Sequence, residues 1–134
     1  MAGNSVPRGL VLDYAGVLTE PDAGELLAAV AVLRARGVRT ALLSNAPGAA
    51  PAARRELGAH FDALVFSGEV GVAKPAAEVY RIAAERLALP VDACVFVDDS
   101  RRNVDGAVAA GMTGVWHTGV PATLDELDAL FPSG

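Results

Sequence analysis

Short apolar runs alternate along this chain with longer segments in which apolar residues recur at helical spacing. The runs have the length of strands, and prolines and glycines mark most boundaries between segments. The predicted strands cover residues 9–12, 38–43, 63–66, 93–97 and 113–116, and the predicted helices cover residues 22–37, 52–57, 75–87, 103–110 and 123–131. This alternation is typical of βαβ units that wind a parallel sheet, so the pattern predicts an α/β fold.

Two of the predicted helices carry a capping-box pattern at their N-terminal ends. Asp22 and Glu25 have the required spacing, and so do Thr123 and Glu126. In such a box the first side chain accepts a hydrogen bond from a backbone N–H of the first helical turn. We therefore expect Asp22 and Thr123 to begin their helices.

The length of the chain limits the number of domains. Its 134 residues are enough for one continuous core and too few for two domains. We expect one domain over residues 1–134, with residues 1–7 flexible. The longest apolar run, residues 26–33, is shorter than the ~20 residues of a membrane span, and the first residues lack a signal-peptide pattern. A cytoplasmic protein without membrane contact is the expectation.

Composition excludes several kinds of chemistry. Cys94 is the one cysteine and lies in an apolar run, which predicts a buried side chain and excludes an internal disulfide or a thiolate metal cluster. The formal net charge is -5 and the arginines are scattered, so the chain offers no basic stripe for a phosphodiester backbone. We expect no nucleic acid partner.

Polar side chains follow three of the predicted strands. Asp13, Ser44 and Asp98 each come after the last apolar residue of a strand. Because parallel strands present their carboxyl ends at one edge of the sheet, these side chains are expected to converge on one crevice. Asp98 and Asp99 are adjacent carboxylates, which repel each other unless a cation is present, and hard oxygen ligands favour Mg²⁺.

Lys74 stands out against the composition of the chain. The sequence contains ten arginines and no other lysine, so a preference for arginine is overridden at this position. A compact ammonium differs from a planar guanidinium as a point charge for phosphate and carboxylate. This choice of residue predicts that Lys74 acts as a compact positive charge for anionic groups.

The segment from Leu10 to Gly114 resembles the haloacid dehalogenase (HAD) superfamily. The resemblance is carried by four motifs in order, LVLDYAGVLT, TALLSNAP, GVAKP and VFVDDSRRN, each at a strand end or before a helix. It implies a Rossmann-like three-layer sandwich with a five-stranded parallel sheet in the order 3-2-1-4-5.

The resemblance also implies roles for the polar residues of these motifs. Asp13 would be the nucleophile that forms an aspartyl-phosphate. The implied Mg²⁺ ligands are Asp13, the backbone carbonyl of Ala15, Asp98 and Asp99, with Asp98 acting directly or through water. The implied phosphate ligands are Ser44, the backbone amide of Asn45 and Lys74, and Gly16 and Asn103 would support the site. Asn103 fits a plain helix cap equally well.

One residue departs from the family's phosphatase pattern. Phosphatases of the superfamily usually carry a second aspartate two residues after the nucleophile, and here that residue is Ala15. Loss of a general acid/base costs ~10²- to 10⁴-fold in rate, so we expect weakened hydrolysis in which acyl or aryl phosphates suffer least. The branch of the superfamily that cleaves phosphonoacetaldehyde shares the alanine but needs a second lysine, which this chain lacks, so that activity is rejected. Haloacid dehalogenation is the weaker alternative, because it has no use for the Asp98–Asp99 pair.

The spacing of the motifs leaves no room for a cap domain. Asp13 and Ser44 are 31 residues apart and Ser44 and Lys74 are 30 apart, and one helix and one strand fill most of each interval. A capless site is open to water, so it needs a large substrate or an oligomeric neighbour to complete it. By family analogy alone, a homodimer is a possible assembly.

Two functions remain open at this point. The first is a Mg²⁺-dependent phosphohydrolase acting on a phosphorylated substrate, small or macromolecular. The second is a binding or regulatory module that keeps the metal and anion site without useful turnover. Four other residues are interpreted as unrelated to either function: His60 and His117 as structural or surface residues, and Tyr14 and Trp116 as packing residues. Arg101 and Arg102 could contact an anionic substrate at the rim of the site, but they are interpreted as solvated charges.

Overall fold

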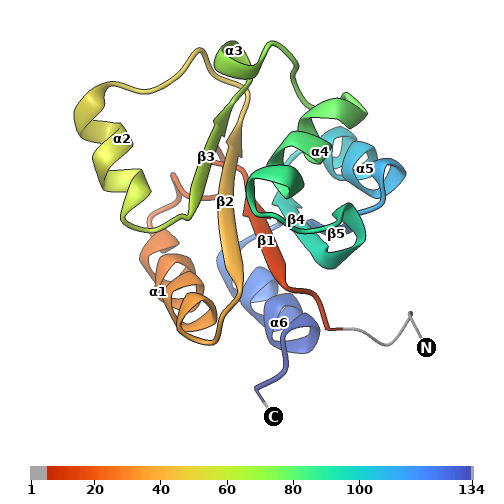
Figure 1. The fold of residues 1–134 in the computed structure, drawn as a ribbon. Helices are drawn as coiled ribbons and strands as arrows, with labels where there is room; N and C mark the ends of the chain where they lie inside the picture. The colour runs from red at the N-terminus through yellow and green to blue at the C-terminus, as the bar shows by residue number, and fades with distance from the viewer. Residues whose placement is uncertain (1–5, 134) are drawn as a thin grey trace.

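The computed structural model describes residues 6–133, which form one α/β unit with a central parallel sheet (Figure 1). The strands are β1 (Gly9–Leu12), β2 (Arg39–Ser44), β3 (Ala63–Phe66), β4 (Cys94–Asp98) and β5 (Thr113–Trp116). They are hydrogen-bonded in the order β3-β2-β1-β4-β5, and every pair is parallel. The predicted α/β class and the predicted strand order are confirmed.

Helices cover both faces of the sheet. They are α1 (Ala23–Ala35), α2 (Pro51–Gly58), α3 (Ser67–Val70), α4 (Ala77–Arg86), α5 (Arg101–Ala110) and α6 (Val120–Leu130), with a 3₁₀ turn, η2 (Val91–Ala93), before β4. Figure 1 shows α1 and α6 together on one face and α4 and α5 together on the other. The pattern did not predict α3 or η2, because each is too short to show a helical period.

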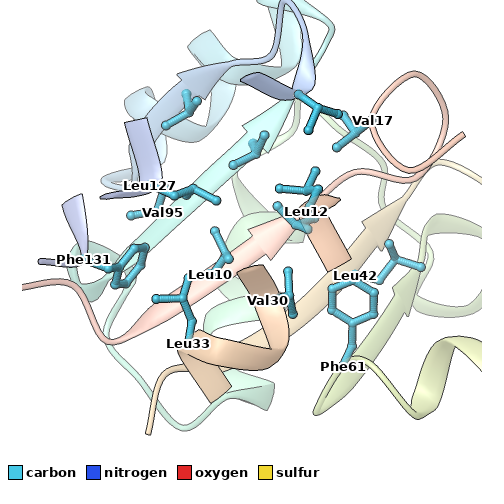
Figure 2. Packing of buried hydrophobic residues seen from close by; sticks show 14 of the residues in the cluster. Leu10, Leu12, Val17, Val30, Leu33, Leu42, Phe61, Val95, Leu127 and Phe131 are labelled. Carbon is cyan, nitrogen blue, oxygen red and sulfur yellow. The ribbon is translucent and has the colours of Figure 1, made fainter. Parts of the chain in front are cut away.

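The alternation of side chains along each strand builds two cores. Leu10 and Leu12 of β1 point into the core beneath α1 and α6, which Figure 2 shows from close by. Val11, between them, points into the other core, together with residues of α4 and α5. Since both faces of every central strand are covered, the polar side chains at strand ends are held on a rigid base.

Neither predicted capping box forms, although Asp22 does stand at the start of its helix as predicted. Asp22 precedes α1 but its side chain makes no capping hydrogen bond. The last helix begins at Val120, three residues before Thr123, because Gly119 and Pro121 start it. The side chain of Thr123 is buried and contacts His117 instead.

Other boundaries differ from the predictions by one or two residues. The fourth helix begins at Ala77 rather than at residue 75, since a turn from Ala73 to Ala76 precedes it. Ser100 caps α5 by accepting a hydrogen bond from the backbone of Asn103, so Asn103 is not the cap. Cys94 is buried in β4, as expected. No helix in the described part of the chain is long and apolar enough to cross a membrane, and of the predicted flexible segment 1–7, residues 1–5 lie outside the described residues.

Candidate active site

The side chains predicted to converge do lie at one edge of the sheet. Asp13 directly follows β1, and Ser44 and Asp98 are the last residues of β2 and β4, the two neighbours of β1. The backbone N–H of Asp13 continues the ladder by donating to the carbonyl of Val97. All three polar side chains are buried, as is that of Lys74, which reaches them from the loop before α4.

Lys74 is at the centre of this cluster. Its Nζ donates hydrogen bonds to Asp13 Oδ1 at 2.7 Å, to Asp98 Oδ2 at 2.9 Å and to the carbonyl oxygen of Leu43 at 3.1 Å. Its side chain is 2% exposed. An ammonium group has three protons, so all of its hydrogen-bonding capacity is used. The lysine therefore compensates two buried carboxylates at once.

The environment of Asp13 changes its proton affinity. Burial raises the pKa of Asp13 to about 6, an effect that the ammonium of Lys74 opposes and the carboxylate of Asp98 reinforces. A bound divalent cation would act in the direction of Lys74 and favour the charged carboxylate. The site is thus built to become fully anionic at Asp13 when more positive charge is added.

Three carboxylates are close enough to share a cation. Asp13, Asp98 and Asp99 each offer an oxygen, and these oxygens lie within 4.8 Å of one another. Ligand oxygens in an octahedral Mg²⁺ site are about 3 to 4 Å apart, because each bond is about 2.1 Å long. A small movement of the exposed Asp99 side chain would bring the set into that range. The all-oxygen donor set fits Mg²⁺.

Asp98 is already heavily hydrogen-bonded within the chain. Its Oδ1 accepts from the backbone N–H of Ser100 at 2.8 Å, and its Oδ2 accepts from Lys74 and, at 3.2 Å, from Asn103 Nδ2. A carboxylate has about four acceptor positions, so little capacity remains for a direct bond to a metal. This arrangement favours Asp98 as a residue that contacts the cation through water.

Gly16 makes room for the carboxylate of Asp99. A Cβ at Gly16 would lie 2.2 Å from Asp99 Oδ2, which is far inside van der Waals contact. The φ of Gly16 is +80°, a left-handed conformation that glycine adopts without strain. The glycine of the first motif is therefore required both by its backbone and by its neighbour.

Asn45 is connected to Lys74 by its side chain. Asn45 Nδ2 donates to the carbonyl of Lys74 at 3.1 Å, and the backbone N–H of Lys74 donates to Asn45 Oδ1 at 2.9 Å. The sequence predicted only the backbone amide of Asn45 as a phosphate ligand. The side chain thus adds a positioning contact that residue type and spacing did not reveal.

Sequence reasoning missed the connection made by His117. This buried residue follows β5, donates its backbone N–H to the carbonyl of Asp98 at 2.8 Å and contacts Thr123 Oγ1 through Nδ1 at 2.6 Å. Its Nε2 contacts the carboxylate of Glu20, in the loop between β1 and α1. The histidine is structural, as predicted, but it connects the end of β4 at Asp98 to the loop after β1 at Glu20. His117 and Glu20 are 97 positions apart in the sequence, so no local pattern signals the pair.

Tyr14 and Trp116 are not packing residues, so that interpretation is wrong. Tyr14 is 41% exposed and Trp116 is 49% exposed. The indole Nε1 of Trp116 donates to the backbone carbonyl of Asp99 at 2.9 Å, and the guanidinium carbon of Arg101 lies 5.0 Å from the centre of the indole ring. Tyr14 follows Asp13 just after β1, and Trp116 is the last residue of β5, so both lie at the carboxyl edge of the sheet. Arg102 is exposed, as expected.

Comparisons with known proteins agree with this geometry. A family model for haloacid dehalogenase-like hydrolases matches residues 7–111. A curated phosphoserine phosphatase from Thermus thermophilus is 35% identical over 99 residues, which are 69% of this chain and 39% of that protein. The chain thus spans well under half the length of this relative.

Solved structures also match. An uncharacterized protein from Corynebacterium glutamicum is 40% identical with a TM-score of 0.86, and the match covers 92% of this chain and 94% of the other. A HAD family enzyme from Bacteroides thetaiotaomicron, an Asp→Ala mutant in complex with magnesium and inorganic phosphate, has a TM-score of 0.56 over 69% of this chain and 51% of that one. At 21% identity, this second likeness shows the fold alone.

Proposed function

The chain belongs to the haloacid dehalogenase-like hydrolase family, and from this we propose that it is a Mg²⁺-dependent phosphohydrolase that works through an aspartyl-phosphate. The observation that carries the proposal is the buried cluster in which Lys74 contacts both Asp13 and Asp98. The oxygens of Asp13, Asp98 and Asp99 lie within 4.8 Å of one another, so these carboxylates could hold a metal ion, with the ammonium of Lys74 beside them.

In this proposal, the chain's own oxygens hold the metal. Asp13, the backbone carbonyl of Ala15 and Asp99 would bind it directly, and Asp98 would bind it through water. When bound, Mg²⁺ supplies positive charge that screens the incoming phosphate from the carboxylates. Ser44 and the amide of Asn45 would bind the phosphoryl oxygens from the other side, and Lys74 would join them by exchanging one of its three present acceptors for a phosphoryl oxygen.

Asp13 is the proposed nucleophile. One of its oxygens is fixed by Lys74, which orients the carboxylate, and the other attacks phosphorus. A bond forms between the carboxylate oxygen and phosphorus, and the bond from phosphorus to the leaving oxygen breaks with its electron pair going to that oxygen. Water then hydrolyses the acyl phosphate and returns Asp13.

No nearby acid of this loop replaces the missing aspartate. Ala15 has no proton to give, and the next carboxylate after Asp13 along the chain, Glu20, is engaged by His117. The leaving group therefore departs as an anion, which slows alkyl esters most. Acyl and aryl phosphates, whose leaving groups are weak bases, are the substrates that this site can cleave.

The lack of a general acid at Ala15 also supports a second function. A protein that binds Mg²⁺ and a phosphate group without turnover needs every residue of the cluster except a general acid. Ala15 favours this regulatory module as the alternative. Dehalogenation is the weaker alternative, because it gives the Asp98–Asp99 pair no role.

Hydrolysis of 4-nitrophenyl phosphate with Mg²⁺ separates the two functions. For a phosphohydrolase, Asp13→Asn abolishes the activity, and Ala15→Asp raises kcat by at least tenfold because a general acid is regained. Wild-type protein as inactive as Asp13→Asn would support the binding module. If Mg²⁺ together with a phosphate mimic fails to raise the unfolding temperature, both functions are contradicted.

A further inference from the structure

The indole of Trp116 is fixed at the edge of the candidate site. Trp116 pairs with Asp98 in the β4–β5 register, and its Nε1 donates to the backbone carbonyl of Asp99. Arg101 covers part of the ring, with its guanidinium carbon 5.0 Å from the ring centre. The ring is thus held by one hydrogen bond and one cation–π contact while about half of its surface faces solvent.

Exposed aromatic side chains occur only beside this site in the described part of the chain. The large hydrophobic residues exposed there are Val6, Tyr14, Val32, Val108 and Trp116. Of these, Tyr14 directly follows Asp13, and Trp116 contacts the residue after Asp98. A rigid aromatic ring that remains half exposed is suited to stacking against a flat ligand, since few rotatable bonds are lost on binding.

The missing general acid at Ala15 independently favours a substrate with an aromatic leaving group. Without an acid at Ala15, the leaving oxygen must depart as an anion. A phenol has a pKa of about 10, like the tyrosine side chain. An aliphatic alcohol is about as weak an acid as water, and its pKa is far above that of a phenol. A phenolate therefore leaves much more readily than an alkoxide.

We propose that Trp116 and Arg101 form an aromatic platform that stacks the ring of an aryl phosphate monoester, the substrate class of this site. The inference rests on the proposed function and adds the residues that recognise the leaving group. Phosphorus bonds to Asp13, the bond to the phenolic oxygen breaks with its electron pair, and the phenolate departs from the platform. In a capless protein the platform supplies the contacts that a lid would otherwise make.

Binding of two phosphonates tests the platform without requiring turnover. In the presence of Mg²⁺, calorimetry should show that wild-type protein binds phenylphosphonate roughly five- to tenfold more tightly than methylphosphonate, the increment expected for one stacked ring. Trp116→Ala should bring the ratio close to one, and Arg101→Ala should lower it. Arg102→Ala, a matched exposed arginine, should keep the wild-type ratio.

Three results would overturn the proposal. Equal affinity of the wild type for both phosphonates, or a preference for the phenyl compound that survives in both Trp116→Ala and Arg101→Ala, contradicts the platform and leaves the proposed phosphohydrolase intact. If neither phosphonate binds, the phosphate site itself is contradicted, and the platform with it.

Kinetics give a second measurement. For phenyl phosphate relative to acetyl phosphate, the ratio of kcat/KM values should fall at least fivefold in Trp116→Ala. Equal losses on both substrates would show that the indole only holds Asp99 in place. Ala53→Phe is the control for the other apolar surface nearby, a cavity of about 420 Å³ that also borders Ser44, and it should leave the ratio unchanged. Loss of the phenyl preference in this variant would place the ring in the cavity and overturn the assignment.

The aryl phosphate could be a small molecule or a phosphotyrosine in a protein. Free phosphotyrosine and a phosphotyrosyl peptide distinguish these sources. A higher kcat/KM on the peptide indicates a protein substrate, and equal values indicate a small molecule. Hydrolysis of neither, with acetyl phosphate still hydrolysed, contradicts the aryl class.

Discussion

Each of the three ammonium protons of Lys74 has its own acceptor. These are the carboxylates of Asp13 and Asp98 and the backbone carbonyl of Leu43. A charge so fully enclosed by partners contributes to folding, and under the proposed function it also binds phosphate. Removing it leaves Asp13 and Asp98 buried and uncompensated, which is more costly than the net value of the ion pairs.

Lys74→Met is predicted to destabilise the protein strongly. Without Mg²⁺, the free energy of unfolding should fall by about 3 kcal/mol or more, because two buried carboxylates lose their counter-charge. Mg²⁺ should restore part of the loss by supplying positive charge to the same oxygens. Urea denaturation in EDTA and in Mg²⁺ measures both effects. Equal losses under the two conditions would show that the cation does not bind this cluster.

Gly16→Ala is predicted to weaken Mg²⁺ binding at least tenfold, since the new Cβ would displace the carboxylate of Asp99. Gly37→Ala is the matched control. Its φ is also positive, at +93°, but no heavy atom lies within 4 Å of its Cβ position. Both variants should lose about 1 kcal/mol of stability from backbone strain, and calorimetry should show weakened Mg²⁺ binding only for Gly16→Ala.

At the scale of whole elements, the edge of the sheet opposite the site is fixed by Asp62. This residue precedes β3, and its Oδ2 accepts from the backbone N–H of Thr40 in β2 at 2.7 Å. Its Oδ1 accepts from Arg34 of α1 at 2.8 Å. Although burial acts to raise it, the pKa of Asp62 is lowered, because these hydrogen bonds from Thr40 and Arg34 prevail.

Asp62→Asn is predicted to change the acid side of the stability profile. A lowered folded-state pKa contributes stability above the unfolded pKa of about 3.9, and this stability is lost as pH falls through the folded value. The variant should lose less than about 1 kcal/mol at pH 7, since the pair is partly exposed, and its stability should fall less than that of the wild type below pH 4. Activity should be unchanged, because the residue lies at the other edge.

The pattern of apolar and polar residues predicted the strands and the polar residues at their ends well. Asp13, Ser44 and Asp98 could be placed because each ends a buried strand, and parallel strands end at one edge. The start of α1 could be placed at Asp22, but the first residue of α6 could not, because Gly119 and Pro121 act before the capping pattern at Thr123 begins. Contacts between distant side chains, such as Glu20 with His117, depend on tertiary packing that no local spacing encodes.

Over the whole molecule, both faces of the sheet share one set of strands, so a ligand bound at the strand ends stabilises the entire fold. Mg²⁺ at 100 times its dissociation constant is predicted to add about 2.7 kcal/mol. For a domain of this size, that corresponds to a rise of roughly 10 °C in unfolding temperature. Calorimetric scans with increasing Mg²⁺ measure the shift, and Ca²⁺, which prefers longer bonds and more ligands, should produce a smaller one.

The contact between His117 and Glu20 also determines what the loop after β1 can accommodate. The loop begins at Asp13, which contacts Lys74, and before α1 it reaches Glu20, which contacts His117. Its two ends are therefore anchored while Tyr14 and Ala15 between them are exposed. A segment inserted into this short loop would therefore begin and end at anchored residues. Such an insertion could cover the open edge of the sheet without changes to the core.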